Sequence, residues 1–439
     1  MILGRLRHLA DRGIAVSRES ILASGGGAAY LIAAAALNVS NFVFNVIASR
    51  LLGPSAFGAL GSLLGLLAVV TIVLGALTVA VARTVTADAE QPQPGDLAPS
   101  RAAILATVLS FALVLALALP LRNLLHLASV WPVVILSFVL PLAVAEIVPR
   151  GALLGRLHFR TLSLAVAGSA VTRLVVGVVL IELGMGLNGA ILATVLSQLV
   201  VTAVIVWPVR HELRRVPETT PIKVPLSDAA LALIALGGFS ALNAVDSVLA
   251  RYYLPAVQSG YYVAASTAAQ IAFALPVTIA LMAYPRFVAA ATEKDGDGRR
   301  VLIEGVAVVG TLGFLAAALL SAFPHLVVSV LFGEHYAPAA ATLRVLAWEG
   351  LALGLISVFI YFHLGHRKLM SCASWVGVAG AIALVAGVFH DGQLPIAFVM
   401  VSASFAVLLA MAVQALFGSK TSAQRSLSLP PGEQGASAA

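Results

Sequence analysis

Long apolar stretches separated by short polar breaks make up most of the chain. Many of them reach about 18 residues or more, and as a helix rising about 1.5 Å per residue each would cross roughly 30 Å of hydrocarbon. The alternating segments of about ten residues that are typical of membrane β-barrels are not found. The pattern therefore predicts an all-α polytopic membrane protein.

Clusters of charged residues, Gly and Pro divide the apolar sequence into about 12 predicted transmembrane helices, six on each side of a polar linker. The predicted spans are 28–48, 57–82, 102–120, 127–149, 161–181 and 187–208, followed by 228–250, 260–285, 301–322, 341–363, 369–389 and 394–417. This organisation predicts a basic N-terminal segment (1–27), a first six-helix lobe (28–208), a basic linker (209–227), a second six-helix lobe (228–417) and a disordered Ser/Pro/Gly-rich tail (418–439).

Composition agrees with a membrane location, because 60% of the 439 residues are hydrophobic, only 10% are charged, and the mean hydropathy is +1.02. The single cysteine, Cys372, excludes an intrachain disulfide. The sequence contains no GxxxxGK[ST] motif and no metal-ligand spacing of His and Cys, so we predict no resident cofactor or metal. A membrane glycosyltransferase would need a substantial water-exposed domain, and the internal polar connections are too short for one. We therefore predict that the protein is not an enzyme.

The net charge of +7 follows the predicted topology. If the N-terminus is cytoplasmic, most of the 26 Lys and Arg residues fall in inside segments, and the outside loops hold only Arg50, Arg122, Arg251 and Arg344. The positive-inside rule then predicts that both termini are cytoplasmic. The basic loops are interpreted as orientation signals, and no nucleic-acid partner is expected.

The two predicted lobes contain similar short sequences. "ALNVSN" at 36–41 is matched by "ALNAVD" at 241–246, and each is followed by an arginine, Arg50 or Arg251, and then by a proline. Both copies run from inside to outside, so the repeats are parallel. This echo predicts a duplicated transporter with two pseudo-equivalent lobes around a central cavity.

Four stretches in the same order resemble polysaccharide-biosynthesis flippases of the multidrug/oligosaccharidyl-lipid/polysaccharide exporter superfamily. They begin with "NVIASRLLGPSAFGALGSLLGLLAVV" and "RGALLGRLHFRTLSLAVAGSAVTRLVVGVVLIELGMGLNGAILATVLSQ". They continue with "NAVDSVLARYYLPAVQSGYYVAASTAAQIAFALPVTIALMAYPRF" and "LFGEHYAPAAATLRVLAWEGLALGLISVFIYFHLGHRK". The resemblance covers nearly all of residues 28–417.

This resemblance implies a V-shaped pair of lobes whose cavity opens alternately to each side of a bacterial plasma membrane. The implied cargo is a polyprenyl-pyrophosphate-linked oligosaccharide, moved from the inner to the outer leaflet. The implied partners are membrane lipids and the glycosyltransferases and polymerase of the same pathway. Two alternatives stay open: an ion-coupled multidrug/cation antiporter of the same superfamily, and a lipid II flippase.

Polar residues inside the apolar helices are the candidate site, because an intramembrane polar group usually faces protein or water. Asn38, Asn41 and Asn45 share one helix face, and Asn243 stands in the matching position of the second lobe. These amides suit sugar hydroxyls, and they equally suit hydrogen bonds between helices.

Three charged residues complete this predicted polar chamber. Arg173 is the candidate for an anionic headgroup, with a structural ion pair to Asp246 or Glu349 as the alternative. Glu349 is a further candidate substrate ligand. Asp246 is the candidate for H⁺ or Na⁺ coupling, because a low-dielectric environment disfavours a charged carboxylate.

The remaining candidates lie nearer the span ends. Arg83 could attract a pyrophosphate at the cytoplasmic mouth, or anchor its helix among headgroups. Arg50 and Arg251 are candidate outer gates, and Pro276 is a candidate hinge. Glu146 is predicted to be an interfacial carboxylate, and the tyrosines of "RYYLPAVQSGYY" at 251–262 are predicted to be an interfacial aromatic belt.

Overall fold

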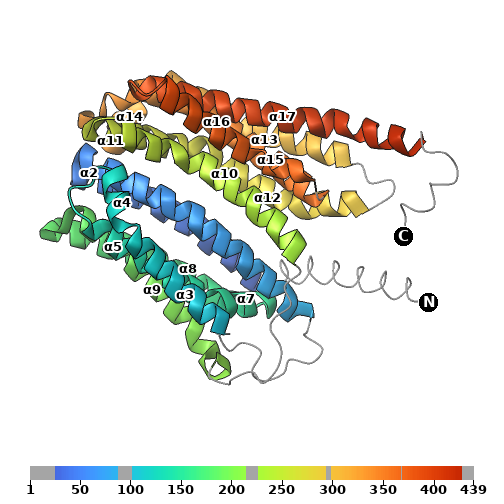
Figure 1. Cartoon of the computed structure of the whole chain (residues 1–439), viewed down its shortest axis with the longest axis horizontal. Helices are drawn as coiled ribbons and strands as arrows, with labels where there is room; N and C mark the ends of the chain where they lie inside the picture. The colour runs from blue at the N-terminus through green and yellow to red at the C-terminus, as the bar shows by residue number, and fades with distance from the viewer. Residues whose placement is uncertain (1–24, 88–100, 214–225, 293–297, 367, 428–439) are drawn as a thin grey trace. The chain divides into compact units, whose positions relative to one another are not determined.

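The computed structural model describes residues 25–87, 101–213, 226–292, 298–366 and 368–427, and this part of the chain is helical and contains no strands. It divides into two compact units, the first comprising residues 1–60 and 74–229 and the second comprising 61–73 and 230–439. Figure 1 shows the helices of both units. The predicted all-α polytopic architecture is therefore confirmed. The predicted N-terminal segment, most of the linker and the end of the tail lie outside the described residues.

The first unit is built mainly from α2 to α9. Their bounds are α2 (Gly25–Ala87), α3 (Arg101–Ala116), α4 (Ala118–Leu124), α5 (Trp131–Ser137), α6 (Val139–Ala145), α7 (Ile147–Gly155), α8 (Phe159–Leu180), a π-helical turn η1 (Ile181–Met185) and α9 (Gly186–Leu213). Helices α8 and α9 pack side by side and form its main contact.

The second unit is built from α10 to α17 together with residues 61–73 of α2. Their bounds are α10 (Leu226–Tyr253), α11 (Ala256–Ala269), α12 (Ile271–Thr292), α13 (Gly298–Ala322), α14 (Pro324–Phe332), α15 (Ala339–Gly365), α16 (Ser374–Gly387) and α17 (Gln393–Leu427). Short 3₁₀ turns occupy η2 (Glu334–Tyr336) and η3 (Leu369–Cys372). The pattern of long apolar stretches did not predict α14.

Several helices contain kinks, so the boundaries of the membrane spans are less clear in the structure than in the sequence pattern. The 63 residues of α2 form two helices joined at a kink at Gly53, whose φ of 71° only glycine adopts readily. Gly184 and Gly186 also have positive φ, at the junction of α8 and α9. In the described residues eight helices are long and apolar enough to cross a membrane, or nine if one bent pair counts as a span. The number 12 stays a prediction.

Helix α15 is the central element of the second unit. It packs against α11, α12, α13 and α17 (Figure 1). Its sequence is mostly apolar and most of its side chains are buried, as expected of a helix packed against several others. Gly350 and Gly354 let neighbours come close, since a Cβ at these positions would lie 2.8 Å from the Ala269 carbonyl oxygen and 2.9 Å from the Pro276 Cβ.

A glycine contact in the first unit gives a test of this packing. A Cβ at Gly177 of α8 would overlap the ring of Phe44, which is fully buried, and would crowd Ala193 of α9. We predict that Gly177→Ala lowers stability by about 1–3 kcal/mol through overpacking, measured as thermal unfolding of the purified protein. Gly75→Ala is the control, because no atom lies within 4 Å of its added Cβ. Equal melting temperatures for both variants would contradict the close packing of α2 on α8.

Candidate functional site

Two buried carboxylates come together in the second unit. Asp246 of α10 is 2% exposed and Glu349 of α15 is 5% exposed. Both side chains line one small cavity, and carboxylates placed in this way repel each other when both are charged. Because an isolated charge is costly to bury, such a pair needs hydrogen-bond donors or a bound cation.

Neighbouring hydroxyl and amide groups supply hydrogen bonds to Asp246. The Ser266 hydroxyl of α11 donates to Asp246 Oδ2 at 2.8 Å. The backbone N–H and the hydroxyl of Ser247 donate to Oδ1. Both carboxylate oxygens are therefore bonded, which fixes the side chain toward α11.

Glu349 is less well satisfied. Its hydrogen bond from the Ser404 hydroxyl of α17 is long, at 3.5 Å. The fully buried Tyr262 lies near both carboxylates, and its hydroxyl has no hydrogen-bond partner among the described residues. Tyr262 therefore does not belong to the interfacial aromatic belt predicted from the sequence, because it faces the protein interior.

A small cavity separates the two carboxylates and has room for about one water molecule. Four helices and the junction between α11 and α12 line it: Asn243, Asp246, Ser266, Ala269, Gln270, Phe273, Leu346, Glu349, Gly350 and Leu353. The predicted residues Asn243, Asp246 and Glu349 thus share one cavity. Its oxygen-rich lining can hold a proton on a carboxylate, or a small cation. No group of three or more His, Cys, Asp or Glu side chains able to hold a metal occurs in the described residues.

Ser266 and Gln270 are site residues that sequence reasoning missed. The helix is interrupted at Gln270, where α11 ends and α12 begins. This break lies upstream of Pro276, which is buried within α12 against Gly354. The available signal was that Ser266 and Gln270 are both polar residues inside an apolar predicted span.

Arg173 lies in the first unit, on α8. Its Nη1 donates to Asn41 Oδ1 of α2 at 3.0 Å, and its guanidinium carbon lies 5.0 Å from the centre of the Phe44 ring. Its Nε is buried and has no partner among the described atoms. Within the described part of this unit Arg173 therefore binds an amide and an aromatic face instead of a carboxylate.

The other predicted asparagines differ from Asn41. Asn38 is exposed and Asn45 is half-buried. The Ser40 hydroxyl next to Asn41 donates to the Ala170 carbonyl of α8 at 3.0 Å. In this stripe Asn41 is thus a helix-packing residue as well as the partner of Arg173.

The predicted gate arginines lie in different environments. Arg50 is exposed. Arg251 is only 4% exposed, and its Nη1 donates to the Ser259 hydroxyl at 3.1 Å and to the Ala256 carbonyl at 3.4 Å. Arg251 therefore connects the end of α10 to the first turn of α11. Arg83 lies in α2, but its side chain is outside the described part of the structure.

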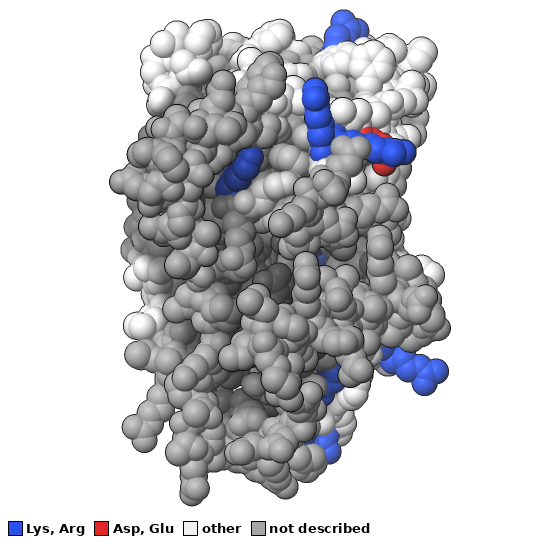
Figure 2. All heavy atoms as spheres, turned by 90° about the vertical axis from the view of Figure 1, so that its right-hand side faces the viewer, with Lys and Arg blue, Asp and Glu red and all other residues white. Residues whose placement is uncertain are grey.

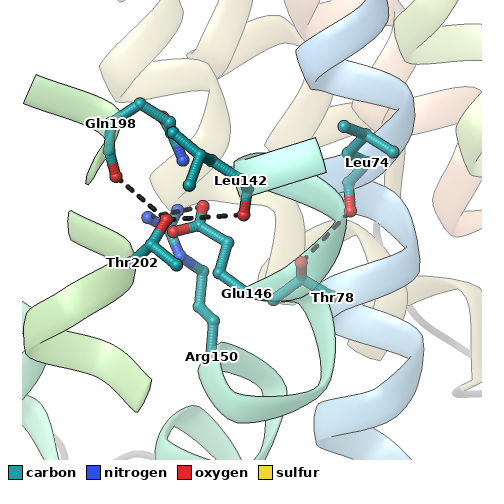
Figure 3. Close-up of polar contacts among 7 residues, drawn as sticks. All are labelled: Leu74, Thr78, Leu142, Glu146, Arg150, Gln198 and Thr202. Atoms are coloured by element: carbon teal, nitrogen blue, oxygen red, sulfur yellow. Dashed lines mark hydrogen bonds and ion pairs between the residues drawn. The ribbon is translucent and has the colours of Figure 1, made fainter. Parts of the chain in front are cut away.

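A second buried polar cluster lies at the break between α6 and α7 (Figure 3), where the helix bends by 41°. Glu146 is 7% exposed and pairs with Arg150 at 3.1 Å. Thr202 of α9 donates to the carbonyls of Gln198 at 2.9 Å and Leu142 at 3.4 Å. Glu146 is therefore buried against its own unit, and the prediction that it lies at the membrane interface stays a prediction. Pro149 has no N–H for the preceding turn, so the helix breaks here and directs Glu146 into the protein.

The comparisons with known proteins agree with this architecture. The family model described as "Polysaccharide biosynthesis protein" matches residues 47–341. This match covers more than half of the chain, so the chain belongs to the polysaccharide biosynthesis protein family. No curated protein sequence matches it significantly.

Solved structures with low sequence identity share the fold. An inward-facing multidrug resistance MATE family transporter of the MOP superfamily is 16% identical, with a TM-score of 0.72 over 90% of this chain and 96% of that one. The lipid II flippase MurJ, in an inward closed conformation, is 12% identical, with a TM-score of 0.69 over 88% and 87%. A MOP superfamily transporter from Pyrococcus furiosus is 15% identical, with a TM-score of 0.55 over 88% and 93%. The fold is therefore that of a multi-pass membrane transporter.

The Glu146 cluster allows a direct comparison of two ion pairs with the same spacing. We predict that Glu146→Gln lowers the free energy of unfolding by about 1–3 kcal/mol, because Arg150 loses its buried partner. Glu304→Gln breaks the exposed Arg300–Glu304 pair, also of i,i+4 spacing and 3.0 Å long, and should change stability by less than about 0.5 kcal/mol. Thermal unfolding in one detergent measures both. Equal effects would show that the buried pair does not hold the α6–α7 break.

Proposed function

We propose that the protein is an alternating-access flippase that moves a polyprenyl-pyrophosphate-linked oligosaccharide from the inner to the outer leaflet for cell-surface polysaccharide synthesis. The observation that carries this proposal is the family match, which covers most of the transporter fold. The family and the similar structures are transporters, and the proposed role needs no catalytic residue. Glycosyltransferases and a polymerase of the same pathway are the proposed partners, because they make and consume such a cargo.

Arg173 is the proposed contact for the anionic pyrophosphate. Asn41 and Phe44 hold the guanidinium on one side, while the buried Nε keeps an unused N–H. A planar guanidinium with a free N–H suits a phosphate oxygen better than an ammonium does. The amides Asn38, Asn45 and Asn243, together with Arg83 and Glu349, are proposed to contact the rest of the substrate during transport.

Asp246 is the proposed ion-coupling residue. Two carboxylates around a small cavity repel each other, and a proton or Na⁺ relieves this repulsion. Binding of the ion would then favour one arrangement of α10 and α15, the helices that carry the two groups. Arg50, Arg251 and Pro276 are proposed to take part in the opening and closing of the transport path.

We also propose that the protein lies in a bacterial plasma membrane with both termini cytoplasmic. The distribution of Lys and Arg along the sequence supports this topology. Figure 2, seen from the right-hand side of Figure 1, shows Lys and Arg at several places among the described residues of that face and acidic side chains at one place.

Two other transport functions are supported by specific observations. The buried acidic pair of the second unit and the fold shared with a multidrug resistance MATE family transporter favour an ion-coupled drug or cation antiporter. The fold shared with MurJ favours a lipid II flippase. The half-buried Arg173 distinguishes these functions, because a guanidinium with no ion pair among the described residues suits an anionic cargo and opposes a cationic one.

The deciding experiment is mass spectrometry of polyprenyl-linked glycans in cells with and without the protein, combined with a probe for the leaflet that holds them. We predict that a complete lipid-linked repeat unit accumulates on the cytoplasmic side when the protein is absent. Accumulation of lipid II instead would support the lipid II flippase. An unchanged lipid pool in cells that become drug-sensitive would contradict both flippase functions and support the antiporter.

Substitutions at Arg173 test the proposed headgroup contact. We predict that Arg173→Ala lowers the rate of glycolipid translocation at least about tenfold, which corresponds to one lost charge-assisted interaction. Arg173→Lys should retain part of the rate, since it keeps the charge and loses the planar fork. Arg344→Ala, at an exposed arginine of α15, is the control. Loss of membrane-inserted protein in Arg173→Ala, with full activity of the protein that remains, would assign Arg173 to packing alone.

A further inference from the structure

Helix α16 contacts α10, which carries Asp246, and α17, which bonds Glu349 through Ser404. The indole N–H of Trp375, near the start of α16, donates to the backbone carbonyl of Ile234 in α10 at 2.8 Å. A carbonyl oxygen has two lone pairs, so Ile234 can accept this bond in addition to its helical one. Tryptophan near a span end is common as an interfacial anchor, but an anchor needs no bond to the backbone of another helix.

Gly238 makes room for this contact. A Cβ at Gly238 would lie 2.7 Å from Cδ1 and 2.8 Å from Nε1 of Trp375, so the indole ring lies directly on the backbone of α10. Gly238 follows Gly237, and two glycines inside a helix weaken it by about 1 kcal/mol each relative to alanine. Trp375 therefore contacts α10 at its locally weakest turn, two turns before Asp246.

Gly377 extends the same contact toward the cavity. A Cβ at Gly377 would lie 3.5 Å from Leu242 of α10 and would also collide with the buried Val407 of α17. On α17, Ser404 donates to Glu349. Helix α16 thus packs between the helix that carries Asp246 and the helix that bonds Glu349.

We propose that Trp375 is a positioning residue for the carboxylate cavity. Its hydrogen bond to Ile234 and its contact with Gly238 hold α10 in the register that directs Asp246 toward α11 and α15. This inference rests on the proposed role of Asp246 in ion coupling. Trp375 touches neither carboxylate, so it acts only through α10.

The geometry is tested first, without any transport assay. In the full-length protein with Cys372→Ala, cysteines replace Asp246 and Glu349, and the rate of cross-linking by a short bifunctional thiol reagent is measured in liposomes. We expect Trp375→Phe, which keeps a ring and removes the N–H, to slow cross-linking at least threefold. Gly238→Ala, which displaces the indole, should slow it to a similar extent. The two changes together should have no more effect than the larger one alone, because both break one contact.

Gly380→Ala is the matched control on the same helix, because its added Cβ meets no atom within 4 Å. It should leave the cross-linking rate unchanged. An unchanged rate in Trp375→Phe, or effects of Trp375→Phe and Gly238→Ala that add, would overturn the proposal.

The functional consequence is tested with native carboxylates. The concentration of H⁺ or Na⁺ that half-saturates transport should shift at least threefold in Trp375→Phe, with an unchanged amount of inserted protein. If cross-linking is slower but the ion concentration that half-saturates transport is unchanged, Trp375 contributes only to packing and the proposed positioning role is wrong. If the wild-type protein shows no ion dependence, the ion-coupling function fails, and the cross-linking result alone decides whether Trp375 positions Asp246.

Discussion

The close approach of α15 to its neighbours is the constraint on which the second unit depends. In hydrocarbon, helices gain little from burying apolar surface against each other, so their association relies on packing and on a few hydrogen bonds. Gly350 and Gly354 allow the backbone of α12 and the end of α11 to come close to α15. This contact places Glu349 within the protein instead of in lipid. A bulkier residue at either glycine would separate the helices that line the cavity.

The carboxylate cavity shows how such a packed unit accommodates charge. Asp246 receives hydrogen bonds at both oxygens, while Glu349 receives one long bond. The two acids are therefore not equivalent. Among the described residues Glu349 is the less well hydrogen-bonded group, and Asp246 is the anchored member of the pair.

In the first unit, the buried charged side chains lie at a helix break and against an aromatic ring. A proline lies in the first turn of each of the short helices α5, α6 and α7, and at the break before α7 Glu146 and Arg150 are paired inside the unit. On α8, Arg173 is held by an amide and a phenyl ring, and no ion pair to it occurs among the described residues. Each unit buries both an acidic and a basic side chain, Glu146 with Arg150 and Arg173 in the first, and Asp246, Glu349 and Arg251 in the second.

Hydropathy alone determined that the chain is an all-helical multi-pass membrane protein, because only helices of sufficient length satisfy their backbone in lipid. The sequence also singled out Asn41, Arg173, Asn243, Asp246 and Glu349, since polar residues are costly in such helices. The sequence could not determine which of these residues lie close together. Helix periodicity relates only residues of the same helix, and Asp246 and Glu349 lie about a hundred residues apart on different helices. Tertiary packing placed Asp246 and Glu349 in one cavity with Ser266 and Gln270. It also buried Tyr262 and Glu146 in the protein interior. In the first unit it brought Arg173 into hydrogen-bond contact with Asn41. Burial depends on which face of a helix its neighbours cover, and an apolar sequence does not mark that face.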